Sequence, residues 1–454
     1  MGEVLSYPLT FVPLSLCHVD GSIHKSPKSA VLNYLESKIA SNQPDRIDVT
    51  IIDAMFFLHL YSNLPLTFGG VAGYLLARIL EVDGEVVHFI FDKWKSPSIK
   101  DSERDSRLTA TENIPYEIKG ANQKRPISWL SALRNSTFKE SLMHFLVKIW
   151  RSDEHARLFN SKTLYVNCND ICYKFYTCSD SVICDEVPEL YCTHEEADSR
   201  MFFHLGSIQS PSNVIIRTAG TDCLIIALTC RLNYDTHIKV WIEVGTYSKN
   251  NQRYISIDDL HSHLGPDLCK ALPTYHALTG SDYTASFSRR GKVKPLKILE
   301  KSTEYQSAFI ALAEDSEIKE TTLNKIEGFV CSIYGVKKTK KVNEARLDIF
   351  LDRYKTKENQ RINTAKKVDG NSMPPCHRVL LEKIKRSSYI SKLWMSSSSP
   401  HPPALSPLNN GWHLNENNQY EILWYYGESC PNKLDVVIEN STDDTFDEYN
   451  EEGK

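Results

Sequence analysis

The sequence has no apolar run that approaches the roughly 20 residues of a membrane-spanning helix. Residues 1–22 lack the basic start of a secretion signal and contain two prolines, so we expect a nuclear or cytoplasmic protein that is not secreted and has no membrane partner. Excess positive charge is absent as well, because the net charge is −4. This balance argues against a constitutive nucleic-acid binder, whose phosphate contacts normally require a basic domain.

Several metal-binding and phosphate-binding signatures are also missing. The twelve cysteines include a cluster between residues 168 and 192, but no pair in it has CxxC spacing, which favours ordinary reduced thiols over a zinc site. No GxxxxGK[ST] phosphate loop is present. A phosphatase of the aspartyl-phosphate type needs a second aspartate two residues after the first, and Met55 stands there after Asp53. The phosphate-loop and aspartyl-phosphatase classes are therefore excluded.

Residues 45–300 carry the pattern of an α/β core. IDVTIID and VVHFIFD have the composition of strands, and GGVAGYLLARILEV between them has helical spacing, which predicts a βαβ unit with parallel strands. Alternation at residues 160–190 predicts a β-meander insertion, and residues 301–398 predict helices that end in a basic amphipathic stretch. The flanking regions are an N-terminal extension over 1–44 with a helix that begins at Ser26-Pro27, a proline-rich linker with a small aromatic segment over 399–440, and an acidic, disordered tail over 441–454.

Acidic residues stand at or just past the ends of short apolar segments throughout this α/β region. In a parallel sheet the carboxyl ends of the strands meet at one edge, so such residues become neighbours in space. Several carboxylates in one crevice repel each other unless cations lie among them, and oxygen ligands select Mg²⁺ or Mn²⁺ over zinc. The sequence therefore predicts a divalent-metal site formed by Asp53, Asp92, Glu196, Asp198, Asp222 and Asp282.

These segments, in their order, resemble the flap-endonuclease/XPG-type nucleases of the PIN-like superfamily. IIDAMFFLHL is similar to the first metal-binding segment of that family, and HFIFDKWKSPSIKDSERDSR is similar to the second, with Lys100, Glu103 and Arg107 in register. HEEADSR, GTDCLIIAL and TGSDYTASF are similar to the three later acidic segments. The resemblance implies a PIN-like three-layer α/β/α core with a mainly parallel sheet, followed by a helical C-terminal extension. The wider set of motifs also resembles PIN-like proteins associated with mobile elements in invertebrate genomes.

The resemblance also implies an activity and a partner. It implies hydrolysis of phosphodiester bonds in branched or flapped DNA, or in RNA, by two cations held on carboxylates. The first cation would be held by Asp53, Asp92 and one of Glu196 and Asp198, and the second by Asp198, Asp222 and Asp282. Lys100 and Arg107 would act as catalytic groups on the scissile phosphate. The family's grip on duplex DNA corresponds to SRRGKVKPLK, which gives a nucleic-acid-binding set of Arg289, Arg290, Lys292, Lys294 and Lys297.

Two departures from the family pattern leave two hypotheses open. Gly220 stands where the family has an aspartate, so one ligand of the second cation is missing, and SRRGKVKPLK lacks the family's paired glycines. The first hypothesis is an active nuclease that depends on Mg²⁺ or Mn²⁺. The second is a catalytically weak module, domesticated from a mobile element, that binds nucleic acid or a partner protein.

Overall fold

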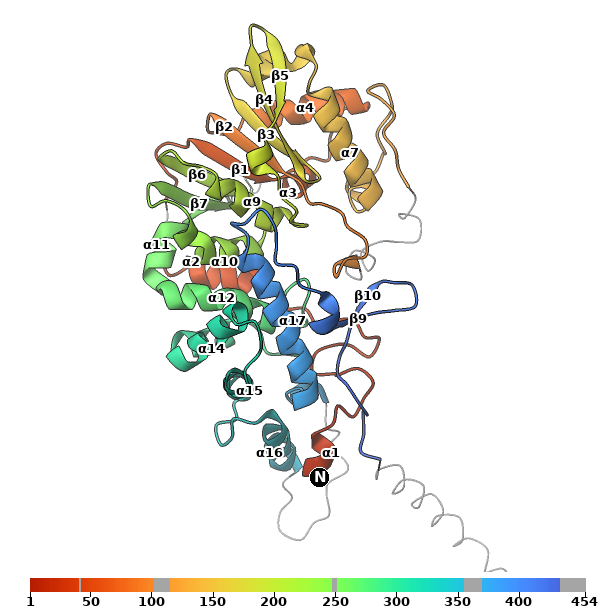
Figure 1. The fold of residues 1–454 in the computed structure, drawn as a ribbon, viewed down its shortest axis with the longest axis vertical. Helices are drawn as coiled ribbons and strands as arrows, with labels where there is room; N and C mark the ends of the chain where they lie inside the picture. The colour runs from red at the N-terminus through yellow and green to blue at the C-terminus, as the bar shows by residue number, and fades with distance from the viewer. Residues whose placement is uncertain (41, 102–114, 247–250, 355–369, 433–454) are drawn as a thin grey trace, which may run out of the picture.

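The computed structural model describes residues 1–40, 42–101, 115–246, 251–354 and 370–432, and an eight-stranded sheet organises the upper half of the view in Figure 1. The strand order is β5-β4-β3-β2-β1-β6-β7-β8. Neighbouring strands from β3 through β2, β1 and β6 to β7 are parallel, while β4, β5 and β8 are antiparallel to their neighbours. The strands are β1 (Val49–Asp53), β2 (Val86–Ile90), β3 (Thr163–Cys168), β4 (Ile171–Cys178), β5 (Ser181–Glu186), β6 (Ser212–Arg217), β7 (Ile238–Val244) and β8 (Arg253–Ser256).

Helices cover both faces of this sheet. Successive strand residues point to opposite faces, and Ile51 of β1 accordingly packs in one hydrophobic cluster while Ile52 packs in the other. The Ile52 face is covered by α3 (Ala54–His59), α4 (Phe68–Leu80), α6 (Trp129–Ala132), α7 (Ser136–Ile149) and α8 (Ala156–Phe159). The Ile51 face is covered by α9 (Ala197–Gly206), α10 (Thr221–Cys230), α11 (Ile257–Leu264) and α12 (Pro266–Thr279). The fold is therefore α/β, with a mainly parallel sheet between helical layers, as the sequence predicts.

The order of the strands places a crevice at β1. The chain adds β2 and β3 on one side of β1 and later adds β6 and β7 on the other side. In open α/β sheets the ligand crevice lies outside the carboxyl ends of the strands at such a change of direction. The predicted βαβ unit is present, since β1 and β2 are parallel with α3 and α4 between them. The predicted meander forms β3, β4 and β5 and continues the main sheet to its edge.

A set of helices extends beyond the sheet in Figure 1, and one of them, α17, is largely buried. α17 packs against α12 and α14. This helix contains the predicted basic stretch, and two of its basic residues, Lys383 and Arg386, are each only 1% exposed. Arg386 donates hydrogen bonds to the carbonyls of Gly411 and Leu423 at 2.9 and 2.6 Å, so it serves internal packing. These helices are α13 (Val293–Glu300), α14 (Thr303–Glu314), α15 (Glu320–Ile333), α16 (Val342–Tyr354) and α17 (His377–Met395).

The N-terminal extension is part of the packed structure. Its first helix, α1 (Gly2–Leu5), contacts α16 (Figure 1). Its second helix, α2 (Ser29–Glu36), starts two residues later than the sequence suggests, with Lys28 as its N-cap in place of Ser26. Val31, Leu32 and Leu35 of α2 are buried in the same hydrophobic cluster as the sheet. Because α2 is held in this way, the residue at its start has a fixed position.

The C-terminal part of the described chain ends in a small hairpin of β9 (Trp412–Leu414) and β10 (Tyr420–Ile422). Trp412 is buried and its ring lies 5.3 Å from that of Tyr389 on α17. The predicted acidic tail over 441–454 lies outside the described residues. Within the described ranges, no helix is long and apolar enough to cross a membrane.

Candidate metal centre

The first two predicted carboxylates lie at the ends of neighbouring strands. Asp53 closes β1 and caps α3, because its Oδ1 accepts a hydrogen bond from the N–H of Phe56 at 3.0 Å. Asp53 pairs in register with Ile90 at the end of β2, and Asp92 follows two residues later. The strand register therefore brings both side chains to the crevice at β1.

A buried asparagine that the sequence analysis missed holds the backbone next to Asp92. Asn167 of β3 accepts a hydrogen bond from the N–H of Phe91 at 2.6 Å and donates one to the carbonyl of Phe91 at 3.0 Å. Asn167 is 2% exposed. The only sequence signal for this role is an amide residue inside the otherwise apolar strand TLYVNC.

The start of α9 supplies two further carboxylates. The N–H of Ala197, in the first turn of α9, donates a hydrogen bond to Oδ1 of Asp92 at 2.8 Å. Glu196 is the N-cap of this helix and Asp198 lies in its first turn, so both sit near the positive end of the helix dipole. Glu196 also forms an ion pair with Lys100, whose ammonium lies 5.3 Å from the ring centre of Tyr283. Lys100 therefore lies beside Glu196 and Tyr283, and its catalytic role stays a prediction.

Asp222 joins the same region from the start of α10. The thiol of Cys223 donates a hydrogen bond to Oδ1 of Asp198 at 2.9 Å, which couples α9 to α10. Asp222 lies in the first turn of α10, and Gly220 is the N-cap of that helix. Gly220 therefore lies next to Asp198 and Asp222.

A lysine that the sequence analysis did not single out lies between Asp222 and Asp282. Lys28 Nζ is 2.7 Å from Asp222 Oδ2 and 2.8 Å from Asp282 Oδ1. The other oxygen of Asp222 is 2.8 Å from Nε2 of His276, and Nδ1 of His276 is 3.2 Å from Nζ of Lys292. His276 is 0% exposed and Lys292 is 2% exposed. Asp222 is thus held from the solvent side by Lys28 and from the interior by His276.

The carboxylates form one electrostatic cluster. Burial, together with the charges of Asp198 and Asp92, raises the pKa of Asp53 to about 8. Burial and the charge of Asp222 raise the pKa of Asp198 to about 6. Burial alone would also raise the pKa of Asp222, but Lys28 and His276 lower it below its usual value. Ionising a further carboxyl group is therefore most costly at Asp53 and Asp198, where no cation offsets the burial and the mutual repulsion.

The donor set suits a hard cation, although the side chains do not yet surround one. Asp53, Asp92 and Asp198 offer carboxylate oxygens, which Mg²⁺ and Mn²⁺ prefer. Among the described residues, no group of three or more His, Cys, Asp or Glu side chains is arranged to hold a metal ion. One oxygen each of Asp92 and Asp198 accepts a hydrogen bond from a protein group instead. The oxygen donors suit such an ion by their chemistry, and binding one would require these side chains to reorient.

Other predicted site residues fall into three groups. Glu103 and Arg107 lie outside the described residues. Lys292 points into the interior toward His276 and is not available to a nucleic acid in this structure. Arg290 is partly buried, with its guanidinium 4.2 Å from the ring centre of Tyr334. The remaining predicted nucleic-acid contacts are exposed: Arg289, Lys294 and Lys297.

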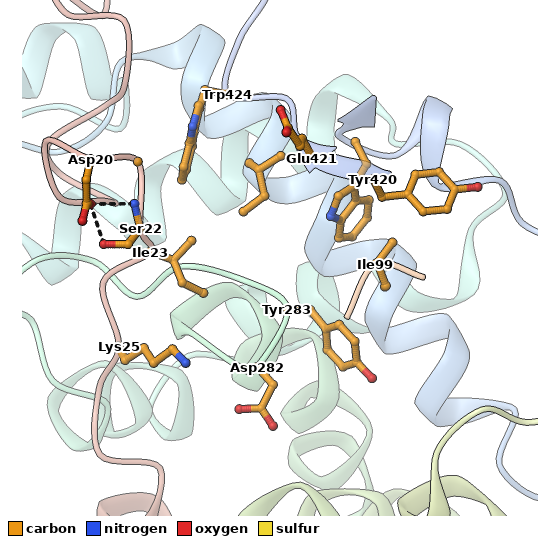
Figure 2. A pocket seen from close by; sticks show the side chains of 13 residues that line it. Asp20, Ser22, Ile23, Lys25, Ile99, Asp282, Tyr283, Tyr420, Glu421 and Trp424 are labelled. Atoms are coloured by element: carbon orange, nitrogen blue, oxygen red, sulfur yellow. Dashed lines mark hydrogen bonds between the residues drawn. The ribbon is translucent and has the colours of Figure 1, made fainter. Parts of the chain in front are cut away.

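A cavity of about 470 Å³ opens beside Asp282 (Figure 2). Its walls come from residues 20–25, from the segment after α12, and from the hairpin of β9 and β10. Four aromatic side chains line it, those of Tyr283, Trp412, Tyr420 and Trp424. The guanidinium of Arg386 lies 5.6 Å from the ring centre of Trp424. The volume lies within the range of about 300–1,000 Å³ that is typical of small-ligand pockets. The lining suits a planar ligand that can stack on aromatic rings.

Comparison of the chain with protein-family models found no match, and comparison with curated proteins found none either. The interpretation of the site therefore depends on its residues, its geometry and the resemblance of its motifs.

Proposed function

We propose that the chain is a divalent-metal-dependent nuclease of the PIN-like, flap-endonuclease type that hydrolyses phosphodiester bonds. The observation that carries this proposal is the cluster of Asp53, Asp92 and Asp198 at the crevice of a mainly parallel sheet. These carboxylates come from the ends of two strands and the start of a helix, and the charges of Asp198 and Asp92, together with burial, raise the pKa of Asp53. Such a concentration of carboxylates is costly for folding alone, and it is typical of a site that takes a cation.

Three carboxylates would hold the ion: Asp53, Asp92 and Asp198, with Glu196 beside them. When bound, a Mg²⁺ or Mn²⁺ ion lowers the pKa of a water ligand and offsets the charge of a phosphoryl group. The chain's own contribution is positioning. Asn167 fixes the backbone before Asp92, the N–H of Ala197 orients the Asp92 carboxylate, and Lys100 supplies a cationic group next to Glu196. In this role Lys100 exchanges its bond with Glu196 for a phosphate oxygen of the substrate.

We assign the substrate class from the surroundings of the cluster. Asp282 lines the aromatic cavity and is linked to Asp222 through Lys28, so an unpaired base stacked in that cavity would place its phosphate near the carboxylates. Stacking on aromatic side chains is the usual means of holding unpaired bases. Exposed basic residues on and before α13 offer phosphate contacts further along a strand. DNA with a flap or branch, or RNA with unpaired segments, meets these requirements.

Two observations favour the alternative, a nucleic-acid- or protein-binding module with little catalysis. Gly220 removes a carboxylate from the crevice, and Lys28 neutralises part of the charge that remains. If the missing carboxylate and the Lys28 charge also prevent the first metal ion from binding, the basic residues and the aromatic cavity would still bind a nucleic-acid strand. The two functions differ in metal-dependent cleavage and share salt-sensitive binding.

Cleavage of end-labelled flap, nicked and single-stranded DNA and RNA in Mn²⁺ tests the proposal. We expect product with the wild type and a loss of at least about 100-fold with Asp92→Asn and with Asp198→Asn. Asp185→Asn is the matched control, because Asp185 is an exposed carboxylate on the edge strand β5. Salt-sensitive binding without any product would instead support the binding module.

A further inference from the structure

The ammonium of Lys28 lies where the resemblance implies a second metal ion. Its Nζ is 2.7 Å from Asp222 and 2.8 Å from Asp282, the two carboxylates that would otherwise share that ion. Given the proposed nuclease function, we propose that Lys28 is a resident substitute for the second cation and that the centre binds one divalent ion. This assignment concerns a residue of the N-terminal extension, outside the segments that resemble the nuclease family.

The position of Lys28 is set by the fold. Lys28 is the N-cap of α2, and the apolar face of α2 is buried against the core. The hydroxyl of Tyr34 donates a hydrogen bond to Glu300 of α13 at 2.7 Å, and Glu36 pairs with Arg253 at 2.5 Å. The Lys28 side chain itself is 24% exposed. The backbone of Lys28 is fixed by the packing of α2, and its ammonium pairs with two carboxylates. Lys28 therefore differs from a mobile surface lysine in a single exposed ion pair.

Both oxygens of Asp222 are already in use. Oδ2 accepts from Lys28, and Oδ1 is 2.8 Å from Nε2 of His276. The ammonium of Lys292 contacts Nδ1 of His276, the ring atom that faces away from Asp222. It also donates to the carbonyl of His276 at 3.0 Å and to the hydroxyl of Thr279 at 3.1 Å. This buried arrangement aims Asp222 at Lys28. A metal ion at Asp222 would have to displace the ammonium or the imidazole.

The absence of a carboxylate at residue 220 has no steric cause. Gly220 has an ordinary φ of −88°, and a Cβ added to it would lie 3.6 Å from Oγ1 of Thr218 and 3.9 Å from Oδ1 of Asp198. A side chain therefore fits there, and Asp is a favoured N-cap residue. The chain has one carboxylate fewer and one ammonium more than a two-ion centre. Like charge between the ammonium and an incoming divalent ion would cancel much of the attraction from Asp222 and Asp282.

The number of Mn²⁺ ions bound per chain tests this proposal. Mn²⁺ binding to the full chain is measured by calorimetry and by the loss of the free-ion resonance signal. We expect one ion in the wild type, one in Gly220→Asp, one in Lys28→Arg, and two in the double variant Lys28→Met with Gly220→Asp. Two ions bound close together also give an exchange-coupled resonance spectrum, which we expect from the double variant alone.

The numbers of bound ions distinguish a failure of the Lys28 proposal from a failure of the proposed nuclease function. Two ions in the wild type, or one ion in a folded double variant, would overturn the role of Lys28 while leaving the nuclease proposal intact. No ion in the wild type would overturn the proposed function itself. If the double variant does not fold, Gly220→Asp alone decides, because two ions in that variant would show that Lys28 does not block the position.

Discussion

Asp92 accepts a hydrogen bond from the backbone N–H of Ala197 at 2.8 Å, although the two residues are 105 positions apart in the chain. This bond joins the end of β2 to the start of α9 at the crevice beside β1. It is a charge-assisted hydrogen bond from a helix N-terminus. It orients the Asp92 carboxylate and also satisfies a backbone N–H in the first turn of α9. Glu196 and Asp198 reach the cluster because α9 starts there.

The carboxylate cluster should lower the stability of the metal-free protein. We expect Asp53→Asn to raise the free energy of unfolding in EDTA by roughly 1–3 kcal/mol, because it removes one of the mutually repelling carboxylates. Asn is as good an N-cap as Asp, so α3 keeps its start. Urea unfolding at pH 8 in EDTA and in Mn²⁺ measures the effect. We expect the wild type, and not Asp53→Asn, to gain stability in Mn²⁺.

The control Asp185→Asn should change neither the free energy of unfolding in EDTA nor the gain in Mn²⁺, since Asp185 is exposed and lies on the edge strand β5. A loss of stability in EDTA for Asp53→Asn would show that the cluster does not strain the metal-free protein.

Asn167 should contribute both to the stability of the fold and to Mn²⁺ affinity. Asn167→Ala leaves the buried N–H and carbonyl of Phe91 without partners, and we expect a loss of roughly 2–4 kcal/mol in the free energy of unfolding. Because Phe91 precedes Asp92, Mn²⁺ affinity should fall too. Asn233→Ala is the control: Asn233 is exposed, and its removal should cost within about 0.5 kcal/mol. Equal effects of the two substitutions would contradict this role.

A buried histidine pair between β2 and α9 should make the fold sensitive to acid. His88 of β2 and His204 of α9 approach through their Nδ1 atoms at 2.9 Å. Burial lowers the pKa of His88 to about 3 and that of His204 well below its usual value. The unfolded chain therefore binds more protons than the native state below about pH 6.5. The free energy of unfolding therefore rises with pH across this window, and acidification from pH 6.5 toward pH 3 lowers it.

Urea midpoints between pH 7 and pH 4.5 measure this dependence. We expect His88→Gln to reduce the loss of stability over that range by roughly 2 kcal/mol, while His263→Gln, at an exposed position, leaves the loss unchanged. Parallel pH curves for the wild type and His88→Gln would contradict the prediction.

The aromatic cavity should contribute to the binding of single strands. Trp424→Ala removes a ring from its wall, and we expect the affinity for single-stranded DNA or RNA to fall about 5- to 100-fold. Fluorescence anisotropy of a labelled oligonucleotide gives the affinities. Tyr426→Ala is the matched control, because Tyr426 is 62% exposed and does not line the cavity. No change in Trp424→Ala, or an equal change in both variants, would rule out stacking at this wall.

The sequence predicts the local features of the site well and its long-range contacts poorly. Strand-ending residues such as Asp53 and Asp92 are visible because β-branched runs and helical spacing are local patterns, and parallel pairing follows from the βαβ order. The predicted strands, their parallel pairing and the helical layers all appear in the structure. The arrangement of an ion among the carboxylates stays a prediction.

The missed features all join residues that are far apart in the sequence. Lys28 meets Asp222 across 194 positions, and Asn167 meets Phe91 across 76. Lys292 reads as one more residue of a basic run, yet it points inward because α12 places His276 beside it. Composition gives the charge of a side chain, while its direction depends on helix packing that no local pattern records.

The most direct test of the account is the anomalous scattering of Mn²⁺ in crystals of the wild-type protein. We expect one strong peak among Asp53, Asp92 and Asp198, and no peak between Asp222 and Asp282, where Lys28 Nζ lies. No peak among Asp53, Asp92 and Asp198, in crystals soaked at the Mn²⁺ concentration of the cleavage assay, would contradict the proposed metal centre.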